Sequence, residues 1–236
     1  MRAGVTILVL VRHGQASFGA RNYDKLSAVG ERQGTLLGQH WLGNDRGGFD
    51  AVYSGAMERQ KVTAERAFAA LGTQPAINIE PAFNEFDHDS VIRAYLPLIA
   101  REHPDFVVDP KKLFNDHDTF EKLFDRLAAY WISGRIGDAP VAETWEAFEA
   151  RCLEGVRRIA EAGHRRVVAF TSGGVITAVL RHALDLEPEK AFRLNWEILN
   201  GSVHSFRLSK QRVVLQRFND IAHLEAEGDE SLLTYR

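Results

Sequence analysis

Two short patterns of a buried strand, each ending at residues suited to hold an anion, constrain this chain more than any other feature. The first covers residues 5–11 (VTILVLV) and leads into RHG at 12–14; the second covers residues 167–171 (VVAFT) and leads into SGG at 172–174. Continuous apolar runs of this length are typical of strands covered on both faces. A helix pattern to about Leu184 follows the second run, so free backbone N–H groups at its start are expected to face an anion.

The rest of the chain alternates strand and helix patterns. Ser27 and Thr144 are typical capping residues at helix starts, and these two helices are expected to reach Leu42 and Ala162. The further elements expected are strands at 50–54 and 77–80, a helix at 56–71, and a closing hairpin of strands at 202–209 and 212–219. This order predicts a three-layer α/β/α sandwich with a mostly parallel, mixed sheet. Binding sites in such sheets lie beyond the carboxyl ends of the strands.

A helical stretch interrupts the alternation between about residues 86 and 140. Its patterns VIRAYLPLIA and FEKLFDRLAAYWI are separated by prolines. We interpret this stretch as a helical cap inserted into a single domain of residues 1–236, and we expect the cap to shape the substrate pocket. The last residues, EAEGDESLLTYR, are mostly polar and are expected to be loose.

Composition narrows the classes of function. The formal net charge is −3 over 236 residues, which predicts no attraction to nucleic acid or to an anionic membrane. The apolar run at 5–11 is too short to span a bilayer. Cys152 is the one cysteine, so we expect a reducing, cytoplasmic setting. The dinucleotide fingerprint, the P-loop and the nucleophile elbow of hydrolases are all absent from the sequence.

The tripeptide RHG contains residues suited to phosphoryl chemistry. The imidazole of His13 can attack phosphorus and form a covalent intermediate. The guanidinium of Arg12 can neutralise phosphoryl oxygens through charge-assisted hydrogen bonds, and Gly14 lets a bulky anion approach the backbone. Three residues alone are weak evidence, and a structural histidine at a strand end is the plain alternative.

The tripeptide is followed by further motifs in a fixed order. The matching residues are Asp24, Leu26, Ser27, Gly30, Gln33, Ser54, Arg59, Thr63, Ala64, Asn200, Ser202, Val203, Asn219, Asp220, His223 and Leu224. In this pattern the chain resembles the histidine phosphatase superfamily, which includes the cofactor-dependent phosphoglycerate mutases. The resemblance extends over almost the whole chain and implies the same α/β fold.

The resemblance also implies roles for individual residues. His13 would accept the phosphoryl group, while Arg12 and Arg59 would clamp it. Glu85 would be the general acid and base, which protonates the leaving oxygen and later activates water. Without the resemblance, Glu85 would be interpreted as a solvated acid in a polar loop.

One position departs from the family pattern. The resemblance implies a second histidine before the two glycines, and this chain has Ser172 there. A serine supplies one neutral hydrogen bond and no charge, and the loss of one donor at a developing oxyanion costs on the order of 100- to 1,000-fold in rate. We still expect Ser172 and Gly173 to bind phosphate, because the glycine-opened helix start is retained.

Two further residues are candidate accessory residues. His88 follows Glu85 closely and is a candidate to compensate for the missing histidine, and Asn200 belongs to a matched motif. His182 and His204 fall within helix and strand patterns, which favours structural roles. The triplets DHD at 87–89 and 116–118 are interpreted as loop and capping residues, and we expect neither a metal nor a cofactor.

The favoured hypothesis is a phosphatase that hydrolyses a small phosphomonoester through phosphohistidine on His13. A phosphoglycerate mutase-like phosphotransferase is the first alternative, and a weakened, phosphate-binding pseudoenzyme is the second. Ser172 favours hydrolysis over transfer, because a mutase must hold phosphohistidine against water. The partner we expect is a small phosphorylated substrate, with a homodimer left open.

Overall fold

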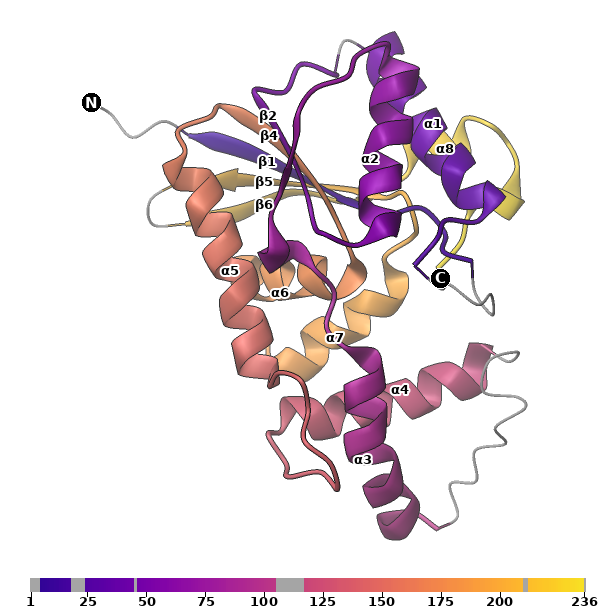
Figure 1. The fold of residues 1–236 in the computed structure, drawn as a ribbon, viewed down its shortest axis with the longest axis vertical. Helices are drawn as coiled ribbons and strands as arrows, with labels where there is room; N and C mark the ends of the chain where they lie inside the picture. Colours follow the sequence, from indigo (N-terminus) through magenta and orange to yellow (C-terminus); the bar gives the residue numbers. More distant parts are fainter. Residues whose placement is uncertain (1–4, 18–23, 45, 105–116, 210–211, 236) are drawn as a thin grey trace.

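The computed structural model describes residues 5–17, 24–44, 46–104, 117–209 and 212–235. Six strands form one sheet in the order β3-β2-β4-β1-β5-β6 (Figure 1). The strands are β1 Thr6–Arg12, β2 Ala51–Ser54, β3 Ile77–Ile79, β4 Arg166–Thr171, β5 Val203–Leu208 and β6 Val213–Asp220. The first four pair in parallel, and the closing hairpin β5–β6 adds antiparallel pairs. The predicted mixed α/β sheet is confirmed.

The helices cover both faces of the sheet (Figure 1). The α-helices are α1 Ala28–Gly43, α2 Glu58–Leu71, α3 His88–Glu102, α4 His117–Ile132, α5 Trp145–Glu161, α6 Gly173–Leu184, α7 Pro188–Glu197 and α8 Ala222–Glu225, with 3-10 turns η1 at Pro81–Phe83 and η2 at Glu230–Leu232. Ser27 and Thr144 cap α1 and α5 as predicted. The helix expected from residue 56 starts at Glu58 instead, because Met57 has extended backbone angles.

Side chains of β1 alternate between two hydrophobic cores, one on each face of the sheet. Val9 and Val11 contribute to the core under α1 and α2. Leu8 and Leu10 contribute to the opposite core, which α5 and α6 cover and which continues into the cap. The strand is therefore buried on both sides, which explains its uninterrupted apolar sequence.

The cap consists of α3 and α4, which extend below α7 in Figure 1. Aromatic side chains join it to the main layer, and Phe86 lies at its base with its ring centroid 4.6 Å from that of Trp131. Trp131 in turn makes an edge contact with Trp145 of α5 at 5.4 Å. The apolar stripe of α4, which includes Leu123, Leu127 and Trp131, is buried in this contact.

The expectation of a loose C-terminus is wrong. Leu232 is only 1% exposed and packs with Leu36 and Leu224. Thr234 pairs with Asn200, whose backbone N–H donates to the Thr234 carbonyl at 2.8 Å. A few apolar residues among polar ones are therefore enough to fix this segment. The helix α7 is not among the elements expected from the sequence.

Two further expectations concern membranes and histidines. None of the helices in the described part of the chain has the length and apolarity needed to cross a membrane. His204 is buried on β5, where its ring contacts the Ser202 hydroxyl at 3.0 Å and accepts from the Asn219 N–H at 3.2 Å. His182 lies exposed on α6. The position of His204 agrees with a structural role.

The buried histidines predict a loss of stability in mild acid. Burial lowers the pKa of His204 to about 3 and that of His223 to about 4, from the ordinary 6.5. Below pH 6.5 the unfolded chain therefore binds protons that the folded chain does not, so stability falls as pH falls. Each histidine should contribute about 2 kcal/mol to the loss in unfolding free energy between pH 7 and pH 5.

Denaturant titrations of wild type, His204→Gln and His182→Gln at pH 7 and pH 5 measure this effect. His204→Gln should show a pH-dependent loss smaller by about 2 kcal/mol, whereas His182→Gln should match wild type. An equal loss in all three proteins would show that His204 does not contribute.

Candidate active site

Three neighbouring strands end at the same edge of the sheet. The strands β1 and β4 are adjacent and parallel, with Arg12 opposite Thr171. The backbone N–H of His13 donates to the Thr171 carbonyl at 2.9 Å. This bond brings the RHG and SGG segments together, and β2 ends beside them at Ser54. The segments therefore lie together at the edge of the sheet where the strand-end rule places binding sites.

The ring of His13 has a defined tautomer. Its Nδ1 lies 2.7 Å from the Gly14 carbonyl oxygen, which can only accept, so Nδ1 carries the hydrogen. Its Nε2 then has a lone pair, and it accepts from Nε of Arg59 at 3.1 Å. Burial, followed by the charges of Arg59 and Arg12, holds the pKa of His13 well below 6.5. The ring is thus neutral at pH 7, with the lone pair of Nε2 directed at a guanidinium.

Arg59 is held by an acid from a distant loop. Its Nη1 donates to Asp24 Oδ1 at 2.8 Å, and its side chain is only 5% exposed. Asp24 Oδ2 accepts from the backbone N–H of Glu58 at the start of α2 at 2.8 Å. Asp24 therefore fixes both the guanidinium and the helix start that carries it. A motif match had pointed to Asp24 without assigning it this role.

Arg12 lies against the start of α6. A Cβ placed on Gly173 would lie 3.8 Å from Cζ of Arg12, so the two are in contact range. The guanidinium donates to the carbonyl of Ile198 and, at 2.8 Å, to that of Tyr235. The segment after α7 and the C-terminal segment thus supply acceptors that the sequence pattern did not reveal.

Glu85 occupies the same corner. Its Oε2 accepts from the backbone N–H of Gly174 at 3.1 Å, and its Oε1 accepts from that of Phe86 at 3.2 Å. A Cβ on Gly174 would lie 2.2 Å from Oε1 of Glu85, which explains the glycine there. One N–H that the helix start was expected to offer to phosphate is therefore engaged by Glu85.

Ser172 is fully buried and is held by a residue that sequence reasoning missed. Nε2 of Gln60 donates to Oγ of Ser172 at 2.8 Å and to the Phe83 carbonyl at 3.0 Å. The carbonyl can only accept, so this side of the Gln60 amide is its NH₂ group. Ser172 Oγ must then accept, and its own hydrogen points elsewhere. Nothing in the sequence distinguished Gln60 from other helix residues.

The two accessory candidates differ in position. Asn200 is fully buried, and its Nδ2 donates to the His13 backbone carbonyl at 3.2 Å, so it stabilises the backbone at the end of β1. His88 packs with its ring 4.1 Å from that of Phe86. Burial lowers the pKa of His88, and Glu85 and Arg59 both interact with it electrostatically. His88 thus lies near the side chains of this cluster, whereas Asn200 contacts the His13 backbone.

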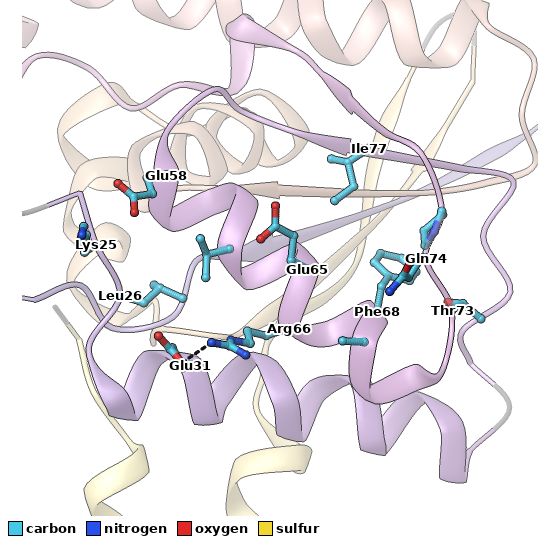
Figure 2. A pocket seen from close by; sticks show the side chains of 13 residues that line it. Lys25, Leu26, Glu31, Glu58, Glu65, Arg66, Phe68, Thr73, Gln74 and Ile77 are labelled. Carbon is cyan, nitrogen blue, oxygen red and sulfur yellow. Dashed lines mark hydrogen bonds and ion pairs between the residues drawn. The ribbon is translucent and has the colours of Figure 1, made fainter.

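A sizeable cavity lies away from this cluster. It has a volume of about 690 Å³ and is lined by Lys25, Leu26, Glu58, Glu65 and Arg66 among others (Figure 2). These side chains extend from α1, α2 and the segments beside them, and none belongs to the predicted site. Within the described ranges, no group of three or more His, Cys, Asp or Glu residues could hold a metal ion. The second DHD triplet lies at the border of the described residues, and residue 116 lies outside them.

One family model matches most of the chain. The family model for the histidine phosphatase superfamily (branch 1) matches residues 8–131 and 113–221. The metal-independent phosphoserine phosphatase of Arabidopsis thaliana is 24% identical over 232 residues, covering 95% of this chain and 85% of that protein.

Two solved structures share the fold. Phosphoglycerate mutase from Bacillus anthracis superposes with a TM-score of 0.63 at 17% identity, covering 96% of this chain and 98% of that one. Phosphoserine phosphatase from Entamoeba histolytica gives 0.62 at 19% identity, covering 93% and 99%. On the extent of the family match, this chain belongs to branch 1 of the histidine phosphatase superfamily.

Proposed function

We propose that this protein is a phosphatase that hydrolyses small phosphomonoesters through a phosphohistidine on His13. The observation that carries the proposal is the state of the His13 ring. Gly14 fixes hydrogen on Nδ1, and the neutral Nε2 lies 3.1 Å from the Arg59 guanidinium. An unprotonated nitrogen beside a fixed cation is the arrangement that attack on a phosphate dianion requires.

The reaction has two steps. In the first, Nε2 of His13 attacks phosphorus, the N–P bond forms, the ester O–P bond breaks, and Glu85 gives its proton to the leaving oxygen. In the second, Glu85 takes a proton from water, the water oxygen attacks phosphorus, and the N–P bond breaks. Arg12 and Arg59 balance the charge on the phosphoryl oxygens in both steps. As substrate enters, a phosphoryl oxygen replaces Nε2 of His13 as the acceptor for Arg59.

Ser172 supplies a neutral hydrogen bond in this scheme. Because Gln60 fills the acceptor side of its hydroxyl, the Ser172 hydrogen is available to a phosphoryl oxygen. A neutral donor stabilises phosphohistidine less than a charged one, which favours hydrolysis over transfer to a second substrate. His88 is the candidate to compensate for the missing second histidine near the phosphoryl group. If His88→Ala keeps the wild-type turnover, this role of His88 is wrong.

The substrate class follows from the family and from the relatives named above. Two of the three are phosphoserine phosphatases, so phosphoserine is the first ester to test, together with p-nitrophenyl phosphate as a generic aryl ester. The main test compares His13→Ala with His182→Ala. His13→Ala should lose on the order of 1,000-fold or more in kcat, and the control should match wild type. Equal rates for the two variants, or phosphate binding with no turnover by wild type, would contradict the proposal.

The state of His13 also predicts how activity depends on pH. Since its pKa is well below 6.5, the ring stays neutral and nucleophilic as pH falls through 6.5. In wild type the acid limb of kcat/KM should therefore begin below pH 6.5. Arg59→Met removes a charge that lowers this pKa, so its acid limb should move to higher pH and its rate should fall. Profiles from pH 4 to pH 9 measure both, and an unmoved limb would contradict the assignment.

The hydrogen bond between Gln60 and Ser172 leads us to expect similar losses in kcat when either residue is replaced. Ser172→Ala removes the donor, and Gln60→Leu removes the group that orients it. Each should lower kcat by about 10-fold or more, and the double variant should lose little beyond either single change because the two act together. Additive losses in single-turnover rates would show that they act independently. Ser172→His tests whether serine is a deficit, which a gain in rate would indicate.

A further inference from the structure

One arginine outside the phosphate cluster organises the loop that carries Glu85. Arg151 lies on α5, and its Nη1 donates to the backbone carbonyls of Ala82 at 2.9 Å, Asn84 at 3.0 Å and Pro81 at 3.3 Å. A single guanidinium nitrogen thus contacts three of the four residues that precede Glu85. The guanidinium carbon also lies 4.9 Å from the centroid of the Phe148 ring, which restricts its position.

The other side of the same guanidinium is tied to the segment that returns from the cap. Nε of Arg151 donates to Glu143 Oε2 at 3.1 Å, and Nη2 donates to Glu143 Oε1 at 2.5 Å. This bidentate pair fixes the plane of the guanidinium. The Glu143 carbonyl accepts from the indole N–H of Trp131 on α4 at 2.9 Å. Arg151 therefore connects the cap, through Glu143, to the Glu85 loop.

The remaining carbonyl of the loop is also satisfied. The Phe83 oxygen accepts from Gln60 Nε2 at 3.0 Å and from Thr171 Oγ1 at 2.8 Å. Every backbone carbonyl from residue 81 to residue 84 therefore has a side-chain donor. Such a loop has few alternative conformations, so the backbone position of Glu85, which follows it directly, is fixed. Arg151 supplies the donors for three of these four carbonyls.

We propose that Arg151 is the positioning residue for Glu85: it holds the loop of residues 81–84 so that the Glu85 carboxylate reaches the leaving oxygen of the substrate. This inference rests on the proposed function, because it takes Glu85 as the general acid. Arg151 touches carbonyls and Glu143 rather than the reacting atoms. Its positive charge also interacts with Glu85. If Arg151 had a purely structural role, its loss would lower the rate equally with all substrates. If it positions Glu85, the loss in rate depends on how much the leaving group needs a proton.

The experiment therefore compares two leaving groups. An alkyl phosphate needs its leaving oxygen protonated, whereas 2,4-dinitrophenyl phosphate does not. Phosphorylation of His13 is followed in single turnovers with wild type, Arg151→Met and the control Arg157→Met. Arg157 lies on the same helix in exposed ion pairs with Glu154 and Glu161. Arg151→Met should lose about 10- to 100-fold with the alkyl ester and less than about 3-fold with the activated ester, at unchanged substrate affinity.

Glu85→Gln separates the inference from the proposed function. If Glu85→Gln lacks the leaving-group dependence, the general-acid assignment itself fails. If Glu85→Gln has it and Arg151→Met loses rate equally with both esters, Arg151 is structural and the inference is overturned. If Arg151 acts through Glu85, the double variant Glu85→Gln with Arg151→Met should react with the alkyl ester only slightly more slowly than Glu85→Gln alone. Should Arg151→Met not fold, Arg151→Lys makes the same comparison, with a smaller but still ester-dependent loss expected.

Discussion

The hydrogen bond from Nδ1 of His13 to the Gly14 carbonyl is the interaction on which the site depends. It sets the tautomer, and the tautomer decides which nitrogen can attack. The loop that provides this carbonyl is packed tightly: a Cβ on Gly14 would lie 2.3 Å from the Gly30 carbonyl oxygen. The Gly14 N–H donates to Thr63 Oγ1 at 3.0 Å. The helices α1 and α2 therefore hold His13, the proposed nucleophile, through the backbone of Gly14.

The charged side chains around the ring are held in the same way, by hydrogen bonds to groups from distant parts of the chain. Arg59 has Asp24 as a carboxylate partner, whereas Arg12 donates to two backbone carbonyls. Carbonyl acceptors satisfy the N–H groups of a guanidinium without cancelling its charge. Glu85 binds the start of α6 through the Gly174 N–H. Arg59 thus contacts the His13 ring, while Glu85 is held at the start of α6.

The sequence predicted the framework of this site more fully than its supports. Arg12, His13 and Gly173 could be placed together because parallel strands end at one edge of a sheet. Arg59 and Glu85 came from the family resemblance, since spacing alone does not bring a helix residue or a loop acid to that edge. The roles of Gln60 and Arg151 required coordinates, because they consist of contacts to carbonyls far along the chain. The C-terminal segment is ordered although its sequence is polar, because its backbone carbonyls at Leu232, Thr234 and Tyr235 accept hydrogen bonds from distant residues, which side-chain pattern does not reveal.

The position of phosphorylation on the ring tests the central claim most directly. The protein, labelled with nitrogen-15 at histidine, is treated with a phosphoryl donor and observed by phosphorus and nitrogen NMR. The account predicts an acid-labile phosphoryl group on Nε2 of His13, with hydrogen retained on Nδ1. A phosphoryl group on Nδ1, or on no histidine while ester is being hydrolysed, would contradict it.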